Sequence, residues 1–579
     1  MSTQRAMKEA SREPASGEPT IVPGREATVR ARYYSLIIVA LYFALQMAGL
    51  KSAPLTDDDD FYIPAGISYA SWLGRVVDGP PGAFERSVMD AAFTPNNEHP
   101  PLAKYVFGIC HFAFSKWLGP ADATRVGTVL FSTLTAFLLL SLAIGHLGGT
   151  RGLRVGGLAV LALLTLPRFY FHSHAATLDV PIAAVYLWAA YVTLRAERST
   201  TAALLAGIPF GLAAATKLNG PFLVLAYILF VLLTRGLWRK PKIPDLRQPG
   251  FVIPPIPVAL LSMMVVGPLV FLAVWPWMWN DTVARIQGYV AFHLNHYPIF
   301  FLYLGQVYAA KPFAPWHAPF VTTLLTVPLA TLALAAGGFL AAWPAIRLRL
   351  RFLSGPDDDF RKEGDLWLFA VINAALTIGV VAFAGTPIYG GEKLFMPFFP
   401  FLCLFAGGGA NMLWERLEAG MASPFLRKIV PASLMIVASM SGVALGWKFW
   451  GYPLSQWNGL ADGARGAAAL GMERQYYDLA FRDLVTWLSK EGPPNLRVHF
   501  LPNNWEYVRT FGWYAKGGDV RKDIQVVQSE AQADWVIVTH ERRFARYGDD
   551  LQRYRGRPII REQTVDGVPI WSVIDARKK

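Results

Sequence analysis

The chain has 579 residues, of which 53% are hydrophobic and only 16% charged, and its formal net charge is +13. This balance lies outside the usual range of soluble domains and predicts an integral membrane protein. The surplus of Lys and Arg is typical of cytoplasmic loops between membrane spans, so we expect no nucleic-acid partner. With only two cysteines, Cys110 and Cys403, neither a disulfide framework nor a Cys-rich metal site can be built.

The chain begins with a polar segment, residues 1–32, which has no apolar periodicity and is expected to be a disordered cytoplasmic tail. Residues 33–50 form the first apolar run, and because no cleavage-site pattern follows it, we expect a retained membrane span. Further apolar runs bring the predicted number of spans to about eleven. These runs lie near residues 126–147, 155–175, 181–195, 201–217, 219–234, 256–275, 319–343, 366–384, 395–413 and 430–450.

Basic residues indicate how these runs are oriented. Clusters of Lys and Arg separate several of the runs, for example at Arg151 and Arg154 and at Arg347 and Arg349. Short cytoplasmic loops hold such clusters in excess, and all clusters stay on one side only if residues 102–117 do not cross the membrane. We therefore expect this segment to lie along the outer interface or to re-enter. An odd number of spans then places the C-terminus outside.

The predicted fold class is accordingly mainly α, with a polytopic membrane domain over residues 33–450 and a small soluble domain behind it. Two outer loops, 51–125 and 275–319, are long and carry polar and aromatic residues, which is typical of loops that build a functional site. Residues 451–579 have a soluble composition and predict a small extracytoplasmic α/β domain. We expect a helix near residues 473–489 and strands near 497–501, 524–527, 535–539 and 570–574.

The run Asp57-Asp58-Asp59-Asp60 directly follows the first span and is the first candidate for chemistry. A solvated loop or a calcium-attracting patch is the ordinary interpretation of such a run. Here the run leads from a span into an amphipathic stretch, at a membrane boundary where unpaired charge is costly, and this favours a functional role. Crowded carboxylates raise the pKa of at least one member, which suits a general base.

A second candidate is the segment Glu98-His99-Pro100-Pro101, which lies in the same outer loop and is followed by Lys104. It can be interpreted as a turn, because two consecutive prolines stop and redirect the chain. It also offers an acceptor, a donor and a cation within one short segment, close in sequence to the acidic run.

His293 and His296 have the spacing that places two side chains on one helical face. Together with Glu98, the two histidines are candidate ligands of a divalent metal, which is the one candidate cofactor, and a phosphate contact is a second functional interpretation. A catalytic zinc site usually has three protein ligands, and the sequence does not establish the third. Interfacial histidines that bind water are the alternative.

Four ionisable residues lie within the predicted spans or at their outer ends. Charged side chains in such places are functional candidates by default, and pairing with one another is the alternative. Lys217 and Lys393 lie in turns between apolar runs and are candidates for binding a lipid phosphate. The four residues are Arg168, Asp179, Lys217 and Lys393.

Taken in order, these features resemble the polytopic GT-C glycosyltransferases of the protein O-mannosyltransferase type (glycosyltransferase family 39-like), including the bacterial lipid A aminoarabinose transferases. The family pattern has an acidic pair after the first span, a His-Pro-Pro-Leu segment, an Arg that opens the next span, a Leu-Asp-x-Pro motif, a Lys-containing turn and a late Pro-rich span. The matching residues are Asp58-Asp59, His99 to Leu102, Arg125, Leu178 to Pro181, Thr216-Lys217, and Glu392-Lys393 to Pro400.

The resemblance implies a GT-C fold, a polyprenyl-phosphate-linked sugar as donor and transfer with inversion to an acceptor hydroxyl of a protein, lipid or glycan. It implies Asp58 as the base and Asp59 as its partner, with a register ambiguity of one residue because positions 57–60 are all Asp. The aminoarabinose transferases have Glu-Lys-Pro-Pro where this chain has Glu98-His99-Pro100-Pro101. Their Lys is linked to the phosphate, and their Glu, with a loop His, to a metal.

Carried over to this chain, the resemblance makes Glu98 and His293 the candidate metal ligands, while His99 replaces the phosphate-linked Lys. The remaining candidates for the lipid phosphate are Lys104, Arg125, Lys217 and Lys393. The resemblance also implies a bacterial inner membrane, with the C-terminal domain in the periplasm and membrane lipids as partners. A secondary transporter or flippase of a lipid-linked sugar, or a non-catalytic scaffold, is the alternative function.

Overall fold

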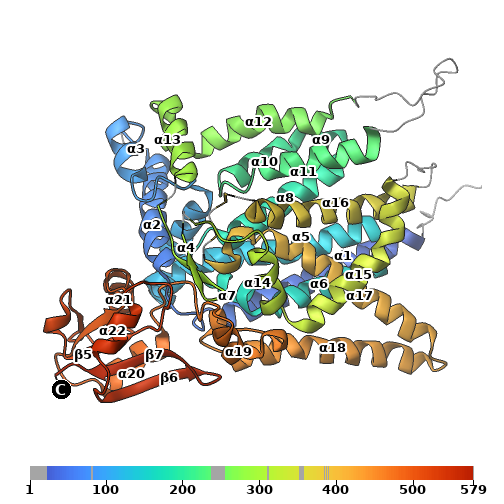
Figure 1. Cartoon of the computed structure of the whole chain (residues 1–579). Helices are drawn as coiled ribbons and strands as arrows, with labels where there is room; N and C mark the ends of the chain where they lie inside the picture. The colour runs from blue at the N-terminus through green and yellow to red at the C-terminus, as the bar shows by residue number, and fades with distance from the viewer. Residues whose placement is uncertain are drawn as a thin grey trace, which may run out of the picture.

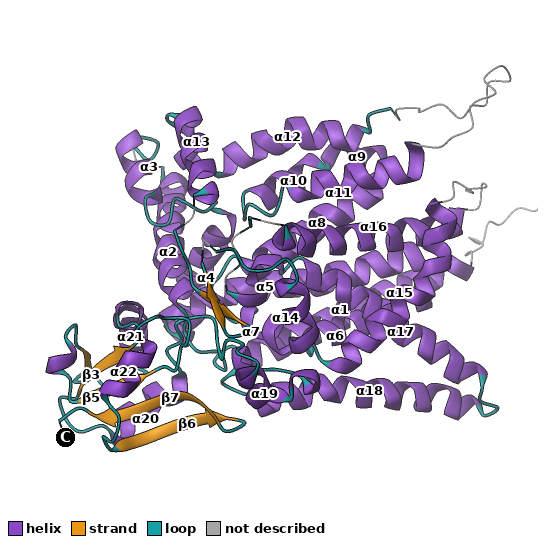
Figure 2. Ribbon diagram, in the orientation of Figure 1, coloured by secondary structure: helices purple, strands orange, loops and turns teal. Residues whose placement is uncertain are grey.

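The computed structural model describes residues 23–79, 82–236, 255–295, 297–309, 312–350, 358–383, 385–386, 388 and 390–577. Within these residues, a bundle of long helices is joined to a five-stranded sheet that lies at a corner of the molecule (Figures 1 and 2). The predicted mainly α architecture with a small C-terminal α/β unit is confirmed.

Helix α1 (Pro23–Ala48) begins ahead of residue 33, where the hydropathy pattern placed the first span. Its first turns are polar, and Glu26 and Arg30 form an ion pair one helical turn apart at 3.8 Å. Such pairs stabilise a helix but do not raise its hydropathy. The prediction that residues 23–32 belong to a disordered tail is therefore wrong. The rest of the predicted tail, residues 1–22, and His296 lie outside the described part of the chain.

Each predicted apolar run overlaps a helix of the bundle. Five helices in the described chain are long and apolar enough to cross a membrane, within α1, α5, α15, α16 and α18. The number of crossings stays a prediction. The bundle helices after α1 are α5 (Pro120–Leu147), α6 (Gly149–Leu164), α8 (Asp179–Ala196), α9 (Thr200–Leu205), α10 (Gly207–Ala214), α11 (Phe222–Val231), α12 (Val258–Val274), α15 (Leu329–Leu350), α16 (Asp358–Ala382), α17 (Phe398–Ala419) and α18 (Pro424–Lys448).

Helices α15 and α17 pack closely because glycine faces backbone where they cross. A Cβ atom at Gly338 would clash with the backbone carbonyl of Phe405, and one at Gly409 would clash with that of Leu334. Small residues permit this close approach between membrane helices.

Three helices at one end of the bundle, α2 (Asp57–Asp78), α3 (Arg86–Phe93) and α4 (Leu102–Leu118), form the predicted first outer loop. Figure 1 shows α2 running across the direction of the long helices. Helix α4 packs on α2 and α5. The second predicted outer loop contains α13 (Thr282–Leu294) and a hairpin of β1 (Phe301–Tyr303) and β2 (Gln306–Tyr308), followed by α14 (Ala318–Thr326). That both loops face the outside stays a prediction.

The C-terminal sheet has the strand order β4-β3-β5-β7-β6. Strand β3 pairs parallel with β4 and β5, while β7 pairs antiparallel with β5 and β6. The hydropathy pattern missed β6, because its residues are mostly exposed and polar. The elements are α20 (Arg482–Glu491), β3 (Arg497–Leu501), α21 (Trp505–Gly517), β4 (Gln525–Val526), β5 (Trp535–Val538), α22 (Tyr547–Arg553), β6 (Ile559–Val565) and β7 (Val568–Asp575).

The helix expected near residues 473–489 begins only at Arg482, and residues 472–479 form neither helix nor strand. Ala480 pairs with Leu55, just ahead of α2, through a backbone hydrogen bond of 3.0 Å from Ala480 N to the Leu55 carbonyl. Tyr514 of α21 closes the junction, since its hydroxyl donates to the Ala480 carbonyl and accepts from Leu55 N. The C-terminal domain is therefore fixed to the start of α2.

Candidate active site

The four consecutive aspartates form the first turn of α2. Thr56 caps the helix: its hydroxyl accepts a hydrogen bond from Asp59 N at 3.0 Å, and the Asp59 carboxylate accepts one from Thr56 N at 2.9 Å. A helix N-terminus stabilises carboxylates in its first turn. Because successive helical residues point about 100° apart, the four side chains meet four different environments.

Asp59 faces the bundle and is fully buried. Arg125 of α5 donates to it twice, from Nε to Oδ1 at 3.0 Å and from Nη2 to Oδ2 at 2.5 Å. The backbone N–H of Ala176 donates to the same Oδ1 at 2.7 Å. This bidentate pair fixes the orientation of α2 and leaves neither charged group facing a cavity.

Asp60 faces the C-terminal domain. Trp513 Nε1 donates to its Oδ1 at 3.0 Å, and Arg509 forms an ion pair with its Oδ2. Both partners belong to α21, so this carboxylate fastens the C-terminal domain to α2.

Asp57 lines a cavity, and in the described chain its buried Oδ1 has no hydrogen-bond partner. Burial, with Asp58 and Asp478 close by, raises the pKa of Asp57 well above its usual value. The protonated form of Asp57 is therefore favoured.

Asp58 lines the same cavity and keeps 20% of its side chain exposed. The hydroxyl of Tyr477 donates to its Oδ2 at 2.8 Å, and Lys393 Nζ lies 3.4 Å from the same oxygen. Lys393 also lies 4.6 Å from the centre of the Tyr477 ring. Asp58 thus combines access to the cavity with a neighbouring cation and a hydrogen-bond donor.

The cavity has a volume of about 370 Å³ and lies between α2, the segment after α13, the turn that carries Lys393, and the C-terminal domain. Aromatic side chains form part of its wall, among them Tyr62, Phe292, Tyr297 and Trp505. Its charged and ionisable groups are Asp57, Asp58, Glu98, His99, Lys393, Asp478, Glu506 and Arg543.

Carboxylates outnumber cations on this wall, and the excess is concentrated near Glu506. Burial, with Asp478 close by, raises the pKa of Glu506 from 4.5 to about 8. Arg543 lies 3.4 Å from carboxylate oxygens of both Asp478 and Glu541. The cavity therefore suits a ligand rich in hydroxyl groups, with Lys393 available on one side for an anion.

Asp179, at the start of α8, lies behind Asp58. Lys217 Nζ is 2.7 Å from its Oδ1, and its Oδ2 is 3.2 Å from the Tyr477 hydroxyl and 3.3 Å from His172 Nδ1. The structure therefore brings together the predicted residues Asp58, Asp179, Lys217 and Lys393, and it joins them through Tyr477.

Lys104 is fully buried and lies beneath the Glu98-His99 turn. Its ammonium donates to the carbonyl of His99 at 2.8 Å and to that of Asn96. Glu98 in turn accepts from Asn96 Nδ2 at 2.8 Å. Lys104 thus shapes the turn that carries Glu98 and His99 to the cavity wall, and Arg125 is likewise buried against Asp59. A direct phosphate contact by either residue stays a prediction.

His293 lies on α13, with its ring centre 5.4 Å from that of His99. In the part of the chain that the structure describes, no group of three or more His, Cys, Asp or Glu side chains is arranged to hold a metal ion. These residues do not by themselves make a metal site of the usual geometry. The metal role of Glu98 and His293 stays a prediction.

Sequence reasoning missed the contribution of the C-terminal domain to the cavity, which consists of Tyr476, Tyr477, Asp478, Asn503, Trp505, Glu506, Arg543 and Phe544. The helix that the sequence predicts near residues 473–489 includes the Tyr-Tyr-Asp run at 476–478. The sequence feature that could have identified these residues is a polar and aromatic run between a span and a soluble domain.

Sequence reasoning also left the pairing of Arg168 open. Arg168 Nη1 donates at 2.8 Å to the carboxylate of Glu392, which neighbours Lys393. This buried pair supports the turn that carries Lys393. Among the four predicted residues themselves, Asp179 and Lys217 form the pair that the alternative interpretation expects.

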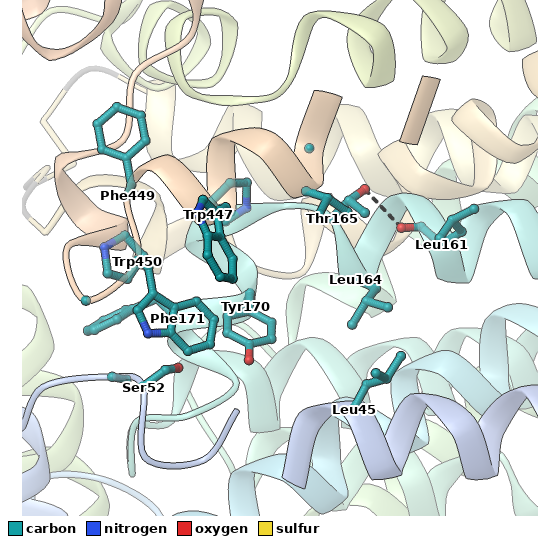
Figure 3. Close-up of a pocket in the computed structure, with 17 residues that line it drawn as sticks. Leu45, Ser52, Leu161, Leu164, Thr165, Tyr170, Phe171, Trp447, Phe449 and Trp450 are labelled. Carbon is teal, nitrogen blue, oxygen red and sulfur yellow. Dashed lines mark hydrogen bonds between the residues drawn. The ribbon is translucent and has the colours of Figure 1, made fainter. Parts of the chain in front are cut away.

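A second cavity, of about 320 Å³, lies between α1, α6, α18 and the short helix α7 (Pro167–His172). Figure 3 shows Leu45, Leu164, Tyr170 and Trp447 around it. Its lining is almost entirely apolar, so it suits a hydrocarbon chain. The carboxylate-lined cavity is therefore the candidate active site.

Comparison with known proteins agrees with this architecture. Residues 98–277 match the family model described as dolichyl-phosphate-mannose-protein mannosyltransferase. The solved structure of ArnT from Cupriavidus metallidurans in the apo state is similar with a TM-score of 0.50 and 15% identity, over 95% of this chain and 99% of that chain. The same ArnT bound to undecaprenyl phosphate gives a TM-score of 0.50 and 13% identity, over 93% and 98%. No curated protein matches the sequence.

The chain therefore has a membrane fold of the GT-C class, a helical bundle with a small C-terminal sheet domain. Within that class, the predicted resemblance to glycosyltransferases of the protein O-mannosyltransferase and ArnT type is confirmed. The sequence match falls on the region from Glu98 to Trp277, while the fold match extends over nearly the whole chain.

Proposed function

We propose that the chain is a membrane glycosyltransferase that moves a sugar from a polyprenyl-phosphate donor to an acceptor hydroxyl, with Asp58 as general base. The observation that carries the proposal is the position of Asp58, which opens to the cavity while Asp59 and Asp60 are each bound to an arginine. The matched family model names dolichyl-phosphate-mannose, and the similar ArnT structure holds undecaprenyl phosphate. Both support a lipid phosphate as donor.

In the proposed reaction, the acceptor hydroxyl gives its proton to the Asp58 carboxylate as its oxygen attacks the anomeric carbon of the sugar. The bond from that carbon to the phosphate oxygen breaks, and the electron pair leaves with the lipid phosphate. Attack opposite to the leaving group inverts the anomeric centre. General-base assistance of this kind contributes about 10²–10⁴ in rate.

Lys393 is the residue that we assign to the lipid phosphate. It lines the cavity, and its ammonium lies 3.4 Å from Asp58, so an anion bound there would be adjacent to the base. A cation in this position stabilises the charge that develops on the leaving phosphate. His99, on the opposite loop of the same cavity, is a second candidate for this contact.

Asp59 and Arg125 act in this proposal as positioning residues. The pair holds the first turn of α2 against α5, and this fixes the direction in which the neighbouring Asp58 points. Asp179 with Lys217 performs the same task from behind the cavity. These assignments revise the prediction in which Asp59 shares the catalytic role.

We further propose that the reaction takes place on the periplasmic face of a bacterial inner membrane. The proposal rests on the distribution of Lys and Arg, which favours a cytoplasmic side opposite to α2 and the C-terminal domain. The acceptor is a hydroxyl of a protein, lipid or glycan.

The experiment that tests this function is transfer or release of sugar from a panel of polyprenyl-phosphate sugars by the purified full-length protein. Asp58→Asn is compared with Asp549→Asn, an exposed aspartate on α22 that serves as the matched control. We expect Asp58→Asn to lower kcat by at least about 100-fold and the control to be unchanged. Full turnover by Asp58→Asn would show that the base is assigned wrongly.

The same assay with and without a chelator tests the candidate metal ligands. If activity falls with the chelator and returns with a divalent ion, Glu98→Gln and His293→Asn should each weaken that recovery. Absence of turnover from every donor, with lipid binding intact, would instead favour the transporter or scaffold alternatives.

A further inference from the structure

The C-terminal domain places one phenol inside the candidate active site. Tyr477 belongs to the loop between α19 (Gly463–Ala469) and α20, which is tied to the bundle where Ala480 pairs with Leu55. Its ring is almost fully buried, and only 1% of the residue is exposed. The rings of Phe171, His172 and Tyr476 surround it at centre-to-centre distances of 6.2, 5.9 and 5.3 Å. The ring is therefore held in place, and its hydroxyl proton is the part that can rotate.

That hydroxyl lies between two carboxylates. Its oxygen is 2.8 Å from Asp58 Oδ2 and 3.2 Å from Asp179 Oδ2. A phenol has a single proton to donate, so it can form one full hydrogen bond to these two acceptors at a time. Asp179 has other donors, because Lys217 lies at 2.7 Å, whereas Asp58 has Lys393 at the longer distance of 3.4 Å.

The phenol remains protonated in this environment. Burial, with Asp58 and Asp179 close by, raises the pKa of Tyr477 well above its usual value. Tyr477 is thus a donor at all pH values near neutrality and cannot itself serve as the base.

We propose that Tyr477 is a positioning residue that directs its proton to Asp58 while Asp58 is ionised and turns it towards Asp179 once Asp58 has accepted the acceptor's proton. This inference rests on the function proposed above. No proton leaves Tyr477 in this step: the acceptor proton moves to Asp58, the O–H bond of Tyr477 rotates, and Asp58 later releases its proton to water. The C-terminal domain is in this way part of the catalytic machinery.

Several other groups face Asp58 and shape its response to pH. Removing only the hydroxyl of Tyr477 leaves all of them in place and deletes one donor that stabilises the ionised carboxylate. The other groups are Asp57 on the same helix, Tyr297 after α13, Lys393 on the turn before α17, Asp478 beside Tyr477, and Glu506 on α21.

The test is the pH–rate profile of the full-length Tyr477→Phe variant, with Tyr554→Phe as the matched control. Tyr554 donates to Glu530 at 2.6 Å elsewhere in the C-terminal domain, so the control loses a similar hydrogen bond. We expect Tyr477→Phe to lower kcat about tenfold and to move the acid limb of the profile to higher pH by about one unit, with KM for the donor little changed. The control should change neither.

A second measurement covers the case in which Tyr477→Phe folds poorly. Replacing Tyr477 by 3,5-difluorotyrosine keeps the ring and strengthens its O–H as a donor, so the acid limb should move to lower pH. An unchanged acid limb in both proteins, with Asp58→Asn inactive, would overturn this inference and leave the proposed function standing. Full activity of Asp58→Asn would overturn the proposed function itself.

Discussion

Arg125 and Asp59 lie fully buried against each other, with two hydrogen bonds between guanidinium and carboxylate, 66 residues apart in the chain. The pair determines which aspartate of the run is free to act, because it fixes the rotation of the first turn of α2. Asp58 then points to the cavity.

Arg125→Met should destabilise the protein, because it leaves the Asp59 carboxylate buried without its partner. Breaking a buried pair in this way costs about 3–5 kcal/mol. The thermal midpoint of the detergent-solubilised variant should fall clearly, whereas Arg555→Met, at an exposed arginine, should leave it unchanged. If Arg125 instead bound the donor phosphate, KM would rise while the midpoint stayed the same.

Lys393→Gln should weaken donor binding, because the cavity then loses the cation that lies beside Asp58. We expect kcat to fall about 100-fold, because the charge that develops on the leaving phosphate is no longer stabilised, and KM for the polyprenyl-phosphate sugar to rise as well. Lys490→Gln, at a side chain that is 81% exposed on α20, is the matched control. If Lys393→Gln bound the donor as tightly as the wild type, the phosphate contact would have to be assigned to His99 or Lys217 instead.

Glu506 should make the stability of the folded protein depend on pH. Its pKa is raised from 4.5 to about 8, so between these values the folded state binds more protons than the unfolded state. The contribution of Glu506 to stability is therefore complete below about pH 4.5 and is lost as the pH rises towards 8. Glu506→Gln should flatten the fall of the thermal midpoint between pH 5 and 8, roughly the window set by these two values.

The matched control for this experiment is Glu491→Gln, at an exposed carboxylate on α20. Parallel midpoint curves for wild type and Glu506→Gln would mean that the carboxyl group titrates as it does in the unfolded chain.

Arg509→Met should loosen the contact between α21 and α2, since Arg509 and Trp513 both bind Asp60. We expect faster proteolysis in the segment between α18 and α20, together with a partial loss of activity, because Tyr477 lies in that segment. Arg553→Met, which removes a surface pair with Glu530, is the control. Unchanged proteolysis and activity would argue that the domain is held mainly by the Leu55–Ala480 junction.

Much of this organisation could be predicted from the sequence. Hydropathy located the helices of the bundle, and composition located the C-terminal domain, because burial in a membrane and burial in a soluble core select different residues over long stretches. The acidic run and the Glu98-His99 turn could be recognised as candidate site residues because charged residues beside a span are costly and are usually paired or functional. The exposed strand β6 was missed because its own residues carry little apolar signal.

The class of protein, its main division and a short set of candidate charged residues follow from local composition and spacing, so they can be read from the sequence. Which aspartate faces the cavity, and which residue lies behind it, depends on how distant segments pack. Tyr477 bonds Asp58 across 419 residues, and Trp513 bonds Asp60 across 453. Four identical neighbours in one helical turn differ only in what lies opposite each of them, and packing of distant segments determines that.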